Sequence, residues 1–165
     1  MKPLCVVSCP IDTFSGYGAR SRDFVKSLIE QKDSEWDVKI LPQRWGDCPW
    51  NFLSQDDPLR QRFIGNLQQQ PDVWVQITVP NEFQPVGKFN IGVSAGIETT
   101  LYPGEFIEGN NRMNLNLVSS EHSKNVLINV ATFFLSSPKM PGNQCPVNKK
   151  QKSSGISVKI VDFGC

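Results

Sequence analysis

The turn formed by Ser15, Gly16, Tyr17 and Gly18 contains the residue types best suited to holding an anion. It follows a short apolar run and precedes a helical pattern that starts at Ala19. Glycines let another group approach the backbone closely, and the first N–H groups of a helix carry a partial positive charge. Because such an end stabilises an exposed anion by only about 0.3–1 kcal/mol, we expect the turn to orient a phosphate rather than to bind it alone. Tight packing of the chain against itself is the alternative role for the two glycines.

His122 is the only histidine of the chain, and imidazole is the group most often used for proton transfer. A lone histidine in the first turn of an expected helix is more often a surface or capping residue. Ser120 and Glu121 stand beside it, which raises the question of a hydrolase triad. We exclude a triad because no GxSxG motif is present and because sequence neighbours rarely assemble one.

Two carboxylates and several tryptophans have the chemistry to hold a sugar. Glu82 and Glu98 fall at expected loop or helix starts, where their oxygens can accept hydrogen bonds from hydroxyl groups. For Glu98, stabilisation of a helix N-terminus is an equally good explanation. Trp36, Trp45 and Trp50 can stack on a ring or a base, but burial against a sheet is the favoured interpretation.

The sequence predicts neither a bound cofactor nor a metal. It lacks GxGxxG and GxxxxGK[ST], which counts against a nicotinamide cofactor and against a P-loop nucleotide site. Five cysteines and one histidine form no CxxC pair, and a zinc site needs four well-placed ligands. Free thiols in a reducing cytoplasm are therefore the expected state.

Length and charge exclude several classes of protein. The 165 residues suit one domain, and 17 Lys and Arg against 16 Asp and Glu leave a net charge of +1. This balance argues against a nucleic-acid partner, and no apolar run approaches the roughly 20 residues that span a bilayer. The apolar start between Pro3 and Pro10 is too short for a signal peptide, so we expect a first strand and a cytoplasmic location.

Apolar runs typical of strands alternate with helical patterns along the chain. This order predicts the α/β class: a single Rossmann-like domain with a doubly wound, mostly parallel sheet and helices on both faces. Strands are expected over 4–8, 37–41, 73–79, 89–93 and 115–118, and helices from Ala19, from Asp57, over 104–112 and after Ser119 or Ser120. The domain is expected to cover 1–135, followed by an irregular tail over 136–165 with one further strand at 156–161. Ligands of such sheets bind where the strands end, which here means segments 15–18, 80–83 and 119–122.

Three stretches together resemble the N-terminal half of glycosyltransferases with two Rossmann domains, the GT-B fold of the group 1, retaining type. They are SGYGARSRDFV at 15–25, DVWVQITVPNEFQPVGKFNIGVSAGIETT at 72–100 and GNNRMNLNLVSSEHSKNV at 109–126. The resemblance extends from residue 1 to about residue 130. It rests on the order and spacing of the three stretches, since each alone is only moderately specific.

The resemblance implies transfer of a sugar from a nucleotide-sugar donor to an acceptor hydroxyl, without an obligatory metal or other cofactor. It implies that Gly16, Tyr17 and Gly18 border the donor phosphates, with Arg20 as a supplementary charge. It further implies an acceptor side lined by Asn81, Glu98, Thr99 and Ser120, with His122 and Glu82 as catalytic candidates at the cleft.

The chain departs from this family in its second half. At 165 residues it is too short to contain the C-terminal Rossmann domain that binds the nucleotide, and the segment after Phe134 resembles the family poorly. We therefore expect it to be inactive without a separately supplied donor domain. It is either a truncated copy or a free-standing domain closed by the strand at 156–161. The alternative functions are a non-catalytic glycan- or partner-binding module and, third, a different small nucleotide-binding protein.

Overall fold

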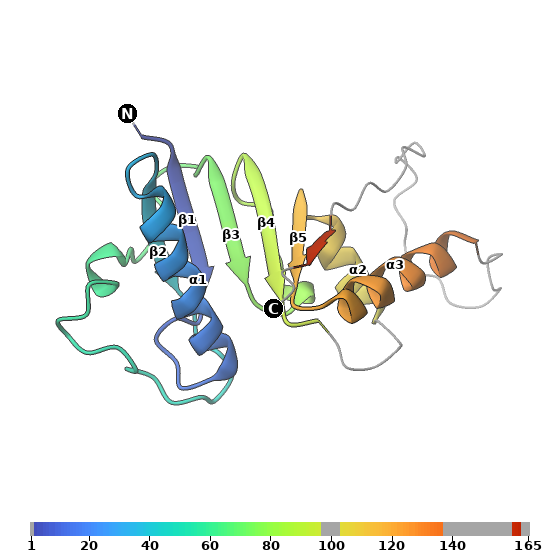
Figure 1. The fold of residues 1–165 in the computed structure, drawn as a ribbon, viewed down its shortest axis with the longest axis horizontal. Coiled ribbons are helices and arrows are strands. Elements are labelled where there is room, and N and C mark those ends of the chain that lie inside the picture. The colour runs from blue at the N-terminus through green and yellow to red at the C-terminus, as the bar shows by residue number, and fades with distance from the viewer. Residues whose placement is uncertain (1, 97–102, 137–159, 163–165) are drawn as a thin grey trace.

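The computed structural model describes residues 2–96, 103–136 and 160–162, which form one six-stranded sheet with helices packed on it (Figure 1). The strands are β1 (Leu4–Cys9), β2 (Asp37–Pro42), β3 (Val73–Ile77), β4 (Phe89–Ser94), β5 (Leu115–Val118) and β6 (Ile160–Asp162). The helices are α1 (Gly16–Lys32), α2 (Gly104–Asn111) and α3 (Glu121–Ser136), with 3-10 turns η1 (Arg60–Arg62) and η2 (Pro80–Glu82).

All five strand pairings are parallel, in the order β2-β1-β3-β4-β5-β6. The chain leaves β1 toward one edge of the sheet to form β2 and then returns to the other side of β1 to form β3. The strand order therefore reverses between β1 and β3, which is where sheets of this kind bind ligands. The predicted α/β class and parallel sheet are confirmed.

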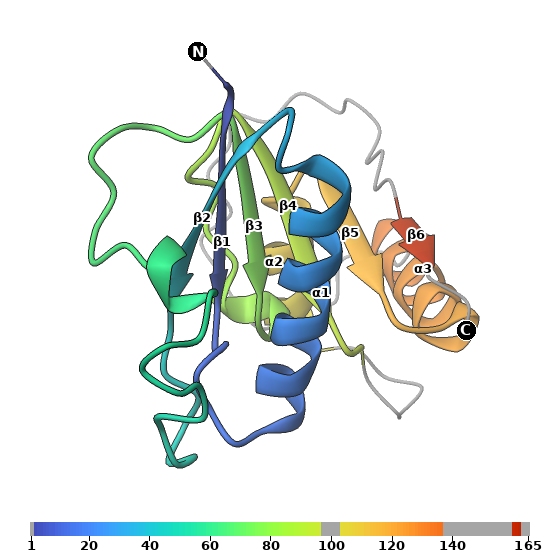
Figure 2. The same cartoon turned by 60° about the vertical axis from the view of Figure 1, so that its left-hand side comes forward.

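The two faces of the sheet differ in chemistry. Alternate residues of the central strands form an apolar face, on which α1 packs with Phe24, Val25 and Leu28; this core includes Cys5, Val7, Cys9, Val75, Ile77 and Val93. The other face carries the buried polar side chains of Ser8, Gln76 and Asn116, which lie in register across the sheet with Gly92 between the last two. Figure 2 shows α1 and α2 on opposite faces. The helices thus cover both faces, as expected.

The prediction of a helix from Asp57 is wrong, because only the 3-10 turn η1 forms there. Asp57 does accept the N–H of Leu59 at 2.9 Å, as a capping residue would. The turn ends at Phe63 because the chain then pairs with the edge strand, and the N–H of Ile64 donates to the carbonyl of Ile40 at 2.8 Å. Pairing with β2 therefore outweighs the local helical preference.

The strand expected over 156–161 overlaps β6 at Ile160 and Val161, and residues 156–159 lie outside the described part of the chain. None of the helices within the described ranges combines the length and hydropathy that crossing a bilayer requires. The division at residue 135 remains a prediction.

Candidate functional site

The loops after β1, β4 and β5 meet at the edge of the sheet where the strands end. The hydroxyl of Tyr17 accepts the N–H of Ala95 at 3.2 Å, and the hydroxyl of Ser119 donates to the carbonyl of Ala95 at 2.6 Å. The structure therefore brings two of the three predicted segments, 15–18 and 119–122, together through the end of β4. The third, 80–83, follows β3 and packs against α2.

Helix α1 begins at Gly16, three residues earlier than predicted, because Ser15 caps it. The backbone of Ser15 is extended, and its hydroxyl accepts the N–H of Gly18 at 2.9 Å. A Cβ on Gly18 would collide with the carbonyl of Thr13 and lie 2.7 Å from the Thr13 hydroxyl. Gly18 therefore serves close packing of the chain on itself, and its amide is already used. Its position beside a donor phosphate remains a prediction.

Gly16 and Tyr17 have a different environment from Gly18. Their N–H groups form no hydrogen bond with any residue in the described ranges. Gly16 is exposed, and a Cβ built on it would have no atom within 4 Å. The first turn of α1 thus presents two open amides at the point where the strand order reverses, which is the electrostatic environment that favours an anion.

The side chain of Tyr17 fixes the turn between neighbouring loops. Its ring stacks on Trp45, in the loop after β2, with 4.3 Å between ring centroids and planes tilted by 31°. Trp45 and Trp50 are half-buried in this loop rather than packed against the sheet, whereas Trp36 does pack against the core as expected. Tyr17 therefore joins the ends of β1, β2 and β4.

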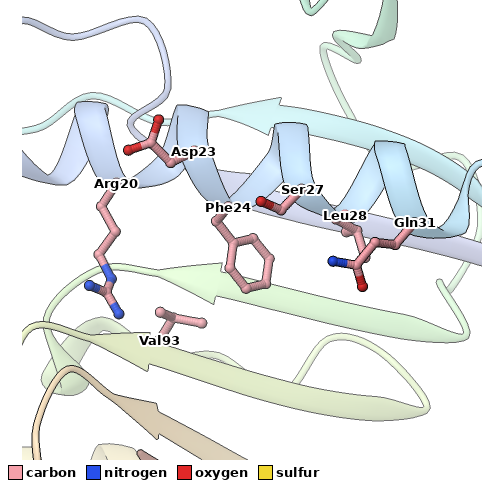
Figure 3. A pocket seen from close by; sticks show the side chains of 7 residues that line it. All are labelled: Arg20, Asp23, Phe24, Ser27, Leu28, Gln31 and Val93. Atoms are coloured by element: carbon pink, nitrogen blue, oxygen red, sulfur yellow. The ribbon is translucent and has the colours of Figure 1, made fainter. Parts of the chain in front are cut away.

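Arg20 lies one helical turn after Gly16, at one end of a groove of about 630 Å³ between α1 and β4. Figure 3 shows its side chain extending from α1 toward β4. The groove is lined by Arg20, Asp23, Phe24, Ser27, Leu28, Gln31 and Val93. Arg20 therefore lies on the side of α1 that faces the sheet, and its phosphate-binding role remains a prediction.

Asn81 and Glu82 lie in the 3-10 turn η2, directly after β3. The hydroxyl of Thr78 donates to the carboxylate of Glu82, which fixes the orientation of that acid. The carbonyl of Asn81 accepts from Arg112 at 3.4 Å. A Cβ on Gly109 of α2 would collide with the carbonyl of Pro80, so α2 and η2 are in direct backbone contact.

Ser120 and His122 occupy the start of α3. The hydroxyl of Ser120 accepts the N–H of Ser123 at 3.2 Å, so Ser120 caps this helix. His122 is exposed in the first turn and makes no hydrogen bond with a residue in the described part of the chain. Glu98 and Thr99 lie outside the described residues, so their predicted role on the acceptor side is not placed.

A buried network of charged side chains beneath the glycine turn was missed in the sequence analysis. Asp12 accepts from Arg60 at 3.0 Å and from the N–H of Leu53 at 2.8 Å. Nη1 of the buried Arg22 donates to the carbonyls of Ile11 and Thr13 at 2.8 and 3.0 Å. The bonds of Asp12 join the loop after β1 to the segment after β2, and those of Arg22 join the loop after β1 to α1. No pattern of spacing could have indicated partners so distant in sequence.

Burial determines the acid–base properties of this region. Desolvation lowers the pKa of Arg22, and the charges of Asp23 and Asp12 oppose that shift. Burial raises the pKa of Cys5 to about 11 and that of Cys9 to about 12, so neither thiol supplies a nucleophile near neutral pH. Within the described ranges, no three His, Cys, Asp or Glu side chains are grouped to hold a metal.

Comparisons with known proteins give no family assignment. No protein-family model matches the chain, and neither the curated proteins nor the solved structures contain a match.

Proposed function

We propose that this chain is the acceptor-side lobe of a glycosyltransferase that uses a nucleotide-sugar donor. The supporting observation is the pair of open amides at Gly16 and Tyr17, placed where the strand order reverses. Sugar transfer releases a nucleoside diphosphate, and preorganised N–H donors stabilise the charge that develops on it. Arg20, one turn further along α1, adds a positive charge on the same helix.

In this proposal the acceptor lies against the loops after β3 and β5. Glu82 has its carboxylate oriented by Thr78, and His122 exposes an imidazole; each is suited to exchange a proton with an acceptor hydroxyl. Asn81 and Ser120, with Glu98 and Thr99, are assigned to hold the other acceptor groups. Nucleoside recognition falls to a second lobe, because two amides and one guanidinium offer no selectivity for a base.

Isothermal titration with UDP- and GDP-sugars tests whether a second lobe, rather than this chain, binds the nucleoside of the donor. The chain alone should bind either donor only weakly, with Kd on the order of 1 mM, which is about −4 kcal/mol. Transfer to an acceptor should appear only when a donor lobe is added. A Kd of about 10 μM or tighter for the isolated chain would contradict the proposal, because this chain would then hold the nucleotide itself.

A non-catalytic glycan-binding module is the second candidate, and one observation favours it. The carboxylate of Glu82 is already hydrogen-bonded to Thr78, and the Gly18 amide to Ser15, so two of the groups that the resemblance implies for the site serve the fold. A module would bind glycans and give no transfer in the presence of any donor lobe. The transfer assay with an added donor lobe separates the two candidates, because both bind a glycan and only the acceptor-side lobe supports transfer.

A further inference from the structure

Two phenylalanines are exposed beside the glycine turn, although aromatic rings normally gain free energy by burial. Phe14 is 54% exposed and Phe52 is 44% exposed, and their ring centroids lie 5.0 Å apart in an edge-to-face contact. Phe14 stands two residues before Gly16, and Phe52 belongs to the loop after β2. Figures 1 and 2 both show these two loops side by side beyond the end of the sheet.

Backbone hydrogen bonds and one cation–π contact position the pair. The N–H of Phe14 donates to the carbonyl of Pro49, and that of Phe52 donates to the carbonyl of Asp12, both at 3.0 Å. The guanidinium of Arg22 lies 3.5 Å from the centroid of the Phe52 ring. Asn51, next to Phe52, has φ of +67°, a left-handed conformation that costs free energy and is retained where the surroundings demand it.

The size and the border of the pair indicate the kind of ligand that it fits. A fully buried phenylalanine covers roughly 150–250 Å², so two half-exposed rings offer far less than the roughly 800 Å² per side of a stable protein interface. The neighbouring Asn51, Ser54 and Gln55 are exposed and polar. A pyranose ring combines one face of C–H groups with a rim of hydroxyls, which matches an apolar patch with hydrogen-bonding groups around it.

We propose that Phe14 and Phe52 form a stacking platform for one sugar ring of the acceptor. This inference rests on the proposed function only in taking a sugar as the ligand. It places one further ring of an extended acceptor against the loops after β1 and β2, beside the open amides of Gly16 and Tyr17, while the reacting hydroxyl stays at the loops after β3 and β5. Preorganisation of the pair by Arg22 and by the two backbone bonds reduces the ordering that binding would require.

Saturation-transfer NMR with methyl β-D-glucopyranoside and methyl α-D-mannopyranoside tests the platform. The intact chain should transfer saturation mainly to the C–H protons of one ring face. Phe14→Ala and Phe52→Ala should each reduce that transfer at least five-fold, while Phe89→Ala should not. Phe89 is a matched control because it is 43% exposed but begins β4, and so lies at the opposite end of the strands from the Phe14 and Phe52 loops. Circular dichroism should show that all three variants fold.

Three results would overturn the platform. The first is that neither sugar receives saturation from the intact chain, and the second is that the transfer survives in both variants. A sedimentation coefficient that rises with concentration, and no longer does so in Phe14→Ala, would assign the pair to self-association instead. The proposed function is judged separately, by titration of the intact chain with nucleoside diphosphates.

Discussion

The carboxylate of Asp12 lies 3.0 Å from Nη2 of Arg60, so a buried acid in the loop after β1 is paired with a cation 48 residues further along the chain. The Asp12 side chain is only 1% exposed and that of Arg60 is 20% exposed. Asp12 also accepts the N–H of Leu53. The pair therefore fixes the loop after β2 against the loop that carries the cap of α1, and it supports both the open amides and the exposed phenylalanines.

Removal of Arg60 should destabilise the chain strongly. Arg60→Ala leaves the carboxylate of Asp12 buried without its cation, and breaking such a pair costs about 3–5 kcal/mol. Urea unfolding measures the loss. Asp12→Ala combined with Arg60→Ala should cost less than the sum of the two single changes, because the orphaned charge is then absent. Arg62→Ala is the control, since its pair with Asp33 is more exposed, and its loss should be much smaller. Equal losses for Arg60→Ala and Arg62→Ala would contradict this account.

The two glycines of the turn should respond oppositely to a methyl group. Gly18→Ala forces a Cβ against the backbone of Thr13 and should lower the free energy of unfolding by about 1–3 kcal/mol or more. In Gly16→Ala the new Cβ lies in open space at a helical position, so this variant should raise the free energy of unfolding by about 0.4–1 kcal/mol. Thermal and urea unfolding of both variants checks the sign. A stable Gly18→Ala variant would show that the turn is looser than described.

Helix α2 offers a second matched pair of glycines. Gly109→Ala places a Cβ against the carbonyl of Pro80 and 3.1 Å from the N–H nitrogen of Asn81, so α2 must move away from η2. We expect a loss of about 3 kcal/mol or more, and faster hydrogen exchange at Phe83. Gly104→Ala, in the same helix but with no atom near its Cβ, should change stability by less than about 1 kcal/mol. Unchanged exchange at Phe83 in Gly109→Ala would argue against the α2–η2 contact.

Stability should fall in alkaline solution because of the buried thiols. The ordinary thiol pKa of 9.0 is raised to about 12 at Cys9 in the folded chain. Above about pH 9 the unfolded chain loses this proton while the folded chain keeps it, so the stabilisation is complete below pH 9 and is lost progressively toward pH 12. One such thiol contributes a slope of up to about 1.4 kcal/mol per pH unit. The free energy of unfolding, measured with urea between pH 8 and pH 11, should fall less steeply with pH in Cys9→Ala than in the intact chain. An equally steep fall would contradict the burial of this thiol.

The strands and their order along the chain were predictable because each is a short apolar run bounded by proline, glycine or a polar residue. β5, for example, was predicted with its bounds intact at Leu115–Val118. Prediction failed at Asp57, where a good capping residue and a helical pattern give only one 3-10 turn. The cause is the long-range bond from Ile64 to Ile40, which no local window contains.

The candidate site was predictable in outline only. The sequence predicted a glycine turn at the start of a helix, and the structure confirms it, although the helix begins at Gly16 rather than at Ala19. The sequence does not distinguish Gly16 from Gly18. The difference is that the carbonyl and hydroxyl of Thr13 lie where a Cβ on Gly18 would be, whereas the space around Gly16 is open. Asp12, Arg22 and Arg60 were missed for the same reason: buried charges are recognised by their partners, and those partners lie 9 to 48 residues away.

The most direct measurement compares diphosphate binding by Gly16→Pro and Gly16→Ala. Proline suits the first position of a helix, and Ser15 before it is extended, with φ −140° and ψ 164°, as a residue before proline requires. Gly16→Pro therefore removes one open N–H while keeping the helix, and Gly16→Ala keeps the N–H. Titration with UDP followed by amide NMR should show shifts at Tyr17 in the intact chain and in Gly16→Ala. In Gly16→Pro, UDP should bind roughly five-fold more weakly, which is about 1 kcal/mol. Equal UDP affinity in the two variants, or no shift at Tyr17 in the intact chain, would contradict the central claim that these amides receive a diphosphate.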